Sequence, residues 1–420
     1  MNYKLGNLIE IVSSTPCNYD HSVGYHDIKP FNKKNNSLIA LHRYPLNTVD
    51  VEKSNLIDIC LWDFKKNKFD IIDQTNAWSW EQGSRLQWVD SNQLIYNKTK
   101  NGKLGAYLYN VETGNKKILE NPVYSIVNNN YLTLNYNRLW SLWKNYGYNI
   151  NQKKITIENK PSNDGVFLCD FDNNKKLVLS IKEAVKICGL EEIDKKFFIA
   201  HPTLSPDGNK FVSLLRFFNS SGILISYFIF TDLENKESKV LATEKATHFE
   251  WINNNSIIVW SRSLNKAFTR IRLNNFTEKY VVQNLKKILR FFNPKIKQRI
   301  LSTHFYLIDL NGIKKNKILD VNTLTEDGHP QISNNGKYLI IDTYANNIGF
   351  QKLMLYDIKN DKTYYIGEFK VAKYLLENNL KYDLHPRWDN EDNLISIDSS
   401  HNGSRQSYVI DIKKLIKNIN

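Results

Sequence analysis

The sequence predicts an all-β fold, a seven-bladed β-propeller of four-stranded antiparallel blades with a short helical insertion. A pattern of a polar start, an apolar residue, a tight Asn/Asp/Gly turn and an apolar run recurs seven times. Each copy is followed by a strand-like stretch that ends at a second turn, which is typical of short antiparallel strands. Seven such units in 420 residues are what a seven-bladed propeller requires.

The clearest copies are His201-Pro-Thr-Leu-Ser-Pro-Asp-Gly and His329-Pro-Gln-Ile-Ser-Asn-Asn-Gly. The seven copies begin at Pro30, Arg85, Val123, His201, His248, His329 and His385. Because a closed array of repeats folds as one unit, we expect residues 1–420 to form a single propeller domain.

Two segments between or before the copies have their own patterns. Residues 8–14 resemble a strand but belong to no copy, whereas the last copy shows three clear strands before Asp411. We therefore expect residues 8–14 to supply the missing fourth strand, which would remove an exposed sheet edge. Residues 181–195 have apolar residues at helical spacing and predict a short helix, and residues 143–148 predict an aromatic-rich loop.

Residues 265–301 break the repeat spacing and predict a basic insertion in blade 5. Within it, residues 285–299 are basic and amphipathic. One interpretation is a helix that makes weak membrane-surface or partner contact. The other is a solvated insertion whose apolar residues pack on the blades.

Composition limits the setting of the protein. The net charge of +14 suits anionic partners, but abundant Asn, Lys and Ile indicate a compositional bias, so we expect no nucleic-acid partner. The four cysteines lack metal-ligand spacing and predict buried free thiols in a reducing compartment. No leader-like or membrane-spanning apolar run occurs in the sequence. We therefore expect a cytoplasmic protein.

Histidine recurs at one place in the pattern, where the innermost strand of a blade begins. His201, His248, His329 and His385 occupy this place in four consecutive copies, and Arg85 occupies it in an earlier one. In a propeller these positions converge around the mouth of the central channel, so the imidazoles can meet there. The alternative is that each histidine caps a turn.

A carboxylate accompanies the last of these histidines, because Asp383 stands two residues before His385. Imidazoles with one carboxylate suit Mn²⁺, Fe²⁺ or Zn²⁺ better than Ca²⁺. We predict one metal ion held by His248, His329 and His385, with Asp383 as fourth ligand or as the group that orients a ligand. His201 is the alternative ligand.

The His-Pro copies and the closing segment resemble the oligogalacturonate lyases and the wider TolB-like propeller group. Those lyases are seven-bladed cytoplasmic propellers that bind Mn²⁺ through three His and a Gln. They eliminate across the C4–C5 bond of a uronate, with an Arg suggested as base. Their last blade carries Gln-x-x-His-x-His-Pro, and the matching positions here are Leu380, Asp383 and His385. His329 and His248 match the other two ligand positions.

The resemblance implies a carbohydrate-active lyase that uses Mn²⁺ on an acidic oligosaccharide or polysaccharide. Residues that would neutralise the uronate carboxylate or take its proton are Arg85, Arg138, Arg405, His201 and Tyr148. Residues that would contact the sugar rings are Trp78, Trp80, Gln82, Trp143 and Tyr146. The second interpretation is a non-catalytic propeller scaffold that presents one face to a glycan or a protein.

Overall fold

The computed structural model describes residues 2–49, 56–148, 150, 156–243, 245–262, 303–312 and 317–419. The predicted insertion at 265–301, including the amphipathic stretch 285–299, lies outside these residues. The chain divides into two compact units. Unit 1 contains Met1–Ile155, Cys169–Asn174 and Gly328–Asn420, and unit 2 contains Thr156–Leu168 and Lys175–Asp327.

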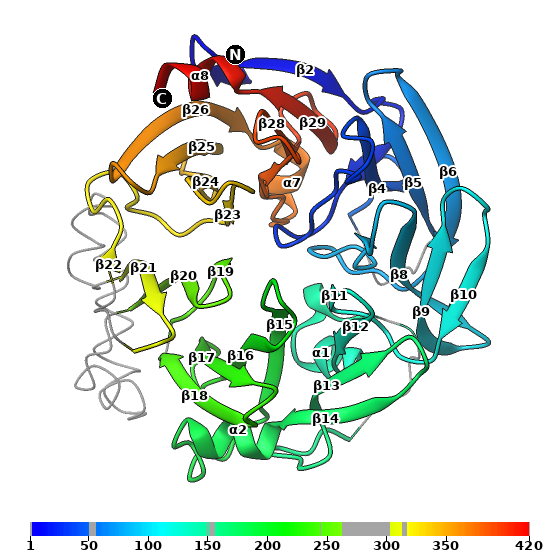
Figure 1. The fold of residues 1–420 in the computed structure, drawn as a ribbon, viewed down its shortest axis with the longest axis vertical. Helices are drawn as coiled ribbons and strands as arrows, with labels where there is room; N and C mark the ends of the chain where they lie inside the picture. The colour runs from blue at the N-terminus through cyan, green and yellow to red at the C-terminus, as the bar shows by residue number, and fades with distance from the viewer. Residues whose placement is uncertain are drawn as a thin grey trace. The chain divides into compact units, whose positions relative to one another are not determined.

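Seven antiparallel sheets form the blades, which confirms the predicted seven-bladed β-propeller (Figure 1). Blades 1, 2, 6 and 7 belong to unit 1. The strands of blade 1 are β3 (Asp20–Ser22), β4 (Leu38–Tyr44), β5 (Ile57–Asp63) and β6 (Lys68–Thr75). Those of blade 2 are β7 (Gln87–Trp88), β8 (Gln93–Lys100), β9 (Lys103–Asn110) and β10 (Lys116–Leu119). Those of blade 6 are β23 (Pro330–Ile332), β24 (Tyr338–Asp342), β25 (Phe350–Asp357) and β26 (Lys362–Lys370).

Blades 4 and 5 belong to unit 2. The strands of blade 4 are β15 (Phe198–Leu204), β16 (Lys210–Phe218), β17 (Leu224–Asp232) and β18 (Glu237–Ala242). Those of blade 5 are β19 (Phe249–Asn253), β20 (Ser256–Arg262), β21 (Thr303–Asp309) and β22 (Lys317–Ile318). Blade 3 has the strand order β11 (Ser125–Val127), β12 (Asn130–Thr133), β13 (Gly165–Asp170) and β14 (Lys175–Ser180).

The C-terminal part of the chain supplies three strands of blade 7, as predicted. These are β27 (Arg387–Trp388), β28 (Leu394–Ser399) and β29 (Gln406–Asp411), and the fourth is β2 (Glu10–Ser14). The register pairs Glu10 with Asp411 and Ser14 with Tyr408. The expected pairing of residues 8–14 with the last strand is therefore confirmed.

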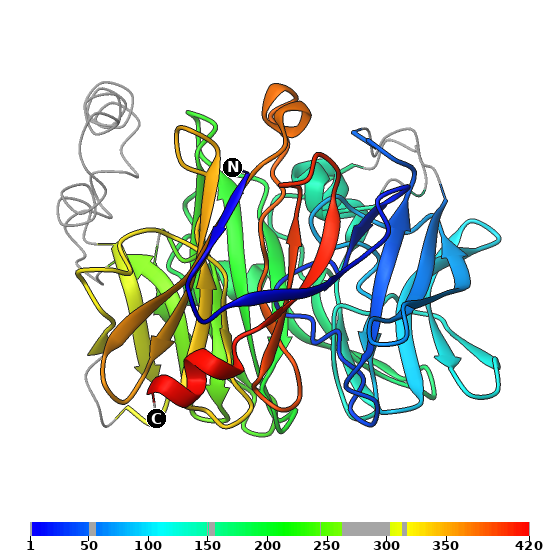
Figure 2. The same cartoon turned by 90° about the horizontal axis from the view of Figure 1, so that it is seen from above.

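A second N-terminal strand, β1 (Tyr3–Leu5), was not predicted. It pairs antiparallel with β26, with Tyr3 opposite Phe369, and makes blade 6 five-stranded. Figure 2 shows the blue N-terminal segment bending between its two strands. One short segment therefore covers the outer edges of two successive blades.

The apolar core of unit 1 lies between neighbouring blades. One cluster joins blades 6 and 7 through residues such as Ile340, Leu355, Ile397 and Ile410. Another joins blades 1 and 2. In unit 2, a further cluster joins blades 4 and 5. In each of these three pairs of blades, alternating strand residues thus bury the facing sides of the two sheets against each other.

The helices in the described part of the chain are short. They are α1 (Tyr136–Leu142), the 3₁₀ turn η1 (Lys144–Tyr146), α2 (Ile181–Ile187), α7 (Lys373–Glu377) and α8 (Lys413–Ile419). The predicted helix at 181–195 is present over its first half as α2, where Ser180 and Glu183 form a capping box. Residues 188–195 are not helical. The predicted aromatic loop at 143–148 contains η1. It follows α1, which was not predicted and which the Asn135 side chain caps by accepting from the Arg138 N–H.

Two further expectations concern cysteines and membranes. All four cysteines are free, and Cys60 and Cys169 are buried, as predicted. The prediction of burial is wrong for Cys17, which is exposed, and for Cys188, which is partly buried. Within the described ranges, no helix has both the length and the apolar composition needed to cross a membrane. The cytoplasmic location stays a prediction.

Candidate metal centre

Three of the four predicted metal ligands come together in unit 1. His329 precedes β23, and His385 lies two residues before β27, so the repeat places both at the start of an inner strand. One ligand atom from each of His329, Asp383 and His385 lies within 4.8 Å of the others. All three side chains are buried.

The hydrogen bonds of the two imidazoles set their tautomers. His329 Nδ1 contacts Asp342 Oδ1 at 2.9 Å, and His385 Nδ1 contacts the Gly24 carbonyl oxygen at 3.0 Å. Because both partners are acceptors, each Nδ1 carries the proton and each Nε2 keeps its lone pair. Both rings are therefore prepared to donate Nε2 to a cation.

Asp342 holds the two histidines in place together. Its Oδ1 accepts from the backbone N–H of His329 at 2.7 Å, and its Oδ2 accepts from the backbone N–H of His385 at 2.9 Å. A carboxylate that fixes the orientation of a ligating histidine is the usual outer partner of a metal site. Asp342 therefore connects blade 6 to the start of blade 7 at the candidate centre.

Asp342→Asn is expected to weaken metal binding by about 10- to 100-fold, because the amide cannot accept from all three donors. Competition titration with a chelating dye measures the affinity. Asp357→Asn is the matched control, since Asp357 is also buried and accepts backbone N–H groups, from Lys359 and Asn360, but does not belong to the ligand cluster. An Asp342→Asn protein with wild-type affinity would contradict the role of Asp342.

Buried carboxyl groups surround the ligand atoms. Burial raises the pKa of Asp383 well above its usual range, and the charges of Glu81 and Asp342 raise it further. Burial also raises the pKa of Glu81 to about 7. Gln351 donates to Asp383 Oδ1 at 3.0 Å. A cation at this place would offset the repulsion among the three carboxyl groups.

The donor set fits a divalent transition metal. Two imidazole nitrogens and one carboxylate oxygen suit Mn²⁺, Fe²⁺ or Zn²⁺, whereas Ca²⁺ prefers oxygen ligands alone. The residues that would hold the ion are His329, His385 and Asp383.

The other two histidines of the pattern belong to unit 2. His248 Nδ1 lies 2.9 Å from Asp327 Oδ1, and Thr247 donates to the same carboxylate. His201 Nε2 lies 3.3 Å from an Arg216 guanidinium nitrogen, within the bulge of β15. His248 as a third ligand stays a prediction.

The arginines proposed for catalysis are buried in unit 1. Arg85 donates through both terminal nitrogens to Asp27, each at 2.8 Å, and stacks on the Tyr124 ring. Arg405 donates to Asp20 at 3.2 Å and lies 4.4 Å from the Trp80 ring. Both guanidinium groups are thus held by a carboxylate.

Arg138 and Tyr148, two further residues proposed for catalysis, are also buried in unit 1. Arg138 is buried on α1. The Tyr148 ring stacks on Tyr136 at 4.2 Å, and its hydroxyl accepts from Asn97 at 2.9 Å. Burial raises the pKa of Tyr148 to about 12.

The residues proposed to contact sugar divide into buried and partly exposed sets. Trp78 packs on Tyr44, Trp80 Nε1 donates to the Lys381 carbonyl oxygen at 2.6 Å, and Gln82 donates to the Tyr124 hydroxyl. These three are buried. Trp143 and Tyr146 are only partly buried, and their rings stack at 3.6 Å.

Tyr25 connects the partly exposed pair, Trp143 and Tyr146, to the candidate metal centre. The Tyr25 ring lies 6.0 Å from Tyr146 and 5.1 Å from His385. A second aromatic, Tyr344, lies 5.6 Å from His329, and the exposed Lys381 ammonium stands 4.4 Å from the Tyr344 ring. Aromatic rings and one cation therefore extend outward from the ligands.

Several residues of this centre were not identified from the sequence: Tyr25, His26, Asp342, Tyr344 and Lys381. Tyr25 and His26 lie before blade 1, outside the repeat, where the pattern gives no position. Asp342 ends the apolar run of its copy, as Asp398 does in the last copy. This shared position in the repeat could have identified Asp342 from the sequence.

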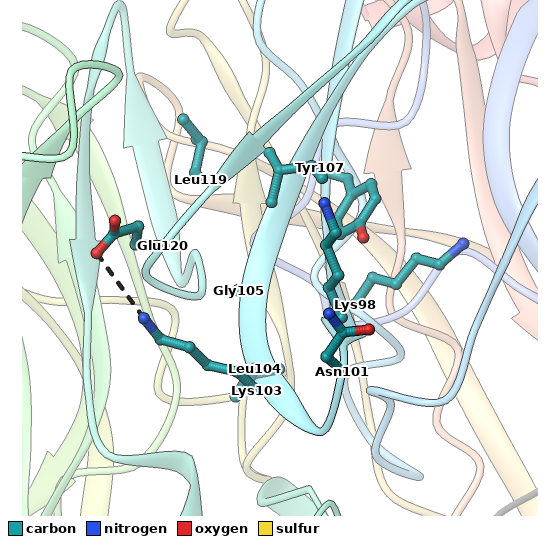
Figure 3. A pocket seen from close by; sticks show the side chains of 10 residues that line it. Lys98, Asn101, Lys103, Leu104, Gly105, Tyr107, Leu119 and Glu120 are labelled. Carbon is teal, nitrogen blue, oxygen red and sulfur yellow. Dashed lines mark ion pairs between the residues drawn. The ribbon is translucent and has the colours of Figure 1, made fainter.

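A cavity of about 360 Å³ lies elsewhere, on the outer strands of blade 2 (Figure 3). Lys98, Lys103, Tyr107 and Glu120 are among its lining residues. Lys98 already pairs with Asp73 at 2.7 Å, and Lys103 lies 3.8 Å from Glu120. Because these charges are compensated, we assign no ligand to this cavity.

Comparison with known proteins identifies the fold. No family model matches the sequence, and no curated protein matches it. An oligogalacturonate lyase solved in complex with manganese matches the structure with a TM-score of 0.61 and 12% identity, over 96% of this chain and 92% of that one. An oligogalacturonate lyase from Vibrio parahaemolyticus matches with a TM-score of 0.59 and 10% identity, over 98% and 96% of the two chains. The chain therefore has the propeller fold of the oligogalacturonate lyases, as its His-Pro copies predicted.

Proposed function

We propose that this protein is a metal-assisted lyase that cleaves uronate-containing oligosaccharides or polysaccharides by β-elimination. The observation that carries the proposal is the buried cluster of His329, His385 and Asp383, whose ligand atoms lie within 4.8 Å of one another. Manganese in a solved lyase of the same fold supports Mn²⁺ as the ion.

Elimination requires stabilisation of the negative charge that forms when the proton on C5 leaves. A bound divalent ion supplies this by coordinating the uronate carboxylate. His329 and His385 would hold the ion in a fixed orientation, because Asp342 and the Gly24 carbonyl set both rings. Fixed donors stabilise a developing charge without reorganising during the reaction.

The chain also offers groups for the sugar. Lys381 is exposed beside Tyr344 and can pair with a second carboxylate of an acidic chain. Trp143 and Tyr146 present a partly exposed aromatic stack, which suits the apolar face of a sugar ring. These residues favour an acidic oligosaccharide over a neutral one.

The test combines metal content with activity. Purified protein is incubated with Mn²⁺ or Zn²⁺, freed of excess metal and analysed by mass spectrometry. It is then screened against uronate polymers by the ultraviolet absorbance of the unsaturated product. We expect one ion per chain, and we expect His329→Ala to lose the ion and the activity together.

His401→Ala is the matched control, because His401 is equally buried but does not belong to the ligand cluster. It should retain the metal. Wild-type protein that binds neither ion would overturn the proposal. A non-catalytic propeller that binds a glycan or a protein would then be the better interpretation.

A further inference from the structure

Residues 20–27, just before blade 1, are fixed by buried charged groups. Asp20 accepts from Arg405, and Asp27 binds Arg85 through both carboxylate oxygens. Between these two ion pairs, the Val23 N–H donates to Asp398 at 3.2 Å. Each such charge-assisted hydrogen bond is stronger than a neutral one. The segment is therefore rigidly placed at both ends and in the middle.

The fixed segment carries His26 to the metal centre. The His26 ring lies 5.1 Å from the His329 ring and 6.1 Å from the His385 ring, measured between centroids. His26 is buried, with 3% of its surface exposed. The close ligand set among the described residues contains His329, Asp383 and His385. His26 therefore stands beside the ligands and not among them.

The elimination needs a group that accepts the proton from C5, and three of the five candidates predicted from the sequence are poorly suited. Arg85 and Arg405 are paired with carboxylates, and burial raises the pKa of Tyr148 to about 12. Histidine is the side chain most often used for proton transfer. His26 lies in the described part of the centre next to both imidazole ligands.

We propose that His26 is the catalytic residue that takes the C5 proton in this reaction, an inference that rests on the proposed lyase function. The C5–H bond breaks, and the proton moves to an imidazole nitrogen of His26. The electron pair forms the C4=C5 double bond as the C4–O4 bond breaks. The proton is then transferred from His26 to the former glycosidic oxygen, which leaves with the departing sugar as a hydroxyl group, so no further reactant is needed.

The neighbouring ion pairs act as positioning groups in this arrangement. The Asp27–Arg85 pair is one residue from His26, and Gln331 donates to the His26 carbonyl oxygen at 3.1 Å. Loss of the Arg85 guanidinium would move the ring rather than remove the base. In this proposal, Arg85 positions His26 and does not itself take the proton.

The experiment compares His26→Gln with wild-type protein in three measurements. These are metal content, the Michaelis constant and the turnover number on the most reactive uronate polymer. We expect unchanged metal content, a nearly unchanged Michaelis constant and a turnover number lowered by about 10²- to 10⁴-fold. In His26→Gly, added imidazole should restore part of the turnover. His401→Gln controls for the loss of a buried histidine.

The outcomes separate the two proposals. A wild-type protein that binds metal but cleaves no uronate polymer overturns the lyase function, and the role of His26 with it. An active wild type with an equally active His26→Gln overturns the role of His26 alone. Loss of metal from folded His26→Gln would make His26 a ligand and also contradict the proposal. If His26→Gln does not fold, the same three measurements on His26→Asn and the rescue of His26→Gly by imidazole test the proposal instead.

Discussion

Deletion of residues 1–15 is expected to lower the free energy of unfolding by several kcal/mol, on the order of the loss of a packed edge strand. The deletion removes β2 from blade 7 and β1 from blade 6. It also removes Leu5, Ile9 and Ile11, which pack on the apolar cluster between these blades. Urea unfolding followed by tryptophan fluorescence measures the change.

Two point variants test the packing of single side chains without removing the strands. Ile11 is partly buried against the cluster, whereas the side chain of the next residue, Val12, is 44% exposed. Ile11→Ser should destabilise by about 1–3 kcal/mol, and Val12→Ser should change the stability little. If the truncated protein unfolds at the same urea concentration as the full chain, the two strands do not contribute to stability.

The second large expected effect is a loss of folding stability at acidic pH. Burial lowers the pKa of His21, His42 and His401 to about 4. The unfolded chain, with histidine pKa values near 6.5, binds more protons than the folded chain between pH 6.5 and 4. Stability from each group is complete above pH 6.5 and is lost as the pH falls toward 4. The loss is on the order of 3 kcal/mol for each histidine.

His401 allows a clean measurement of this effect. Its Nδ1 contacts the Ser399 hydroxyl, and its ring lies among Tyr3, Phe369 and Tyr408. A phenylalanine would fill the same aromatic surroundings without a titratable group. The wild type should therefore lose about 3 kcal/mol more than His401→Phe between pH 7 and 4.

Chemical denaturation at several pH values gives the comparison. The contribution of Glu81 to stability changes with pH in the opposite direction. Burial raises the pKa of Glu81 to about 7, so its contribution falls as the pH rises. Both proteins carry Glu81, so its contribution cancels in the difference. Parallel curves for the two proteins would show that His401 does not titrate below its ordinary range.

The fold could be predicted because its signals are local and repeated. A His-Pro start marks three of the seven copies, and a turn containing Asn, Asp or Gly follows the start of each copy within about a dozen residues. The unpaired strand at 8–14 follows from counting strands. Strand β1 was missed because three residues, Tyr3–Leu5, are too few to show alternation. Helix α1 was missed although Asn135, its cap, is a recognised start signal.

The site was only partly predictable, because repeat position indicates location but not partners. His329 and His385 come together as expected from equal places in two copies. Arg85 holds the same place, yet its carboxylate partner, Asp27, lies 58 residues earlier in the sequence. Nothing in the local sequence indicates that pairing. His26 was hidden for the same reason, since the tertiary contacts of residues 20–27 bring it to the ligands.

The N-terminal strands have a consequence for how the protein is made. Thr15 and Gln406, whose side chains are hydrogen-bonded at 2.6 Å, are 391 residues apart. On the ribosome, β1 and β2 emerge before the other strands but have no partner strands until the last blades have been synthesised. At a synthesis rate of about 5–20 residues per second, β1 and β2 remain without partner strands for tens of seconds. Such long-range pairing gives a high contact order and slow final folding. Meanwhile, the apolar residues of this segment are accessible to chaperones and to other unfinished chains.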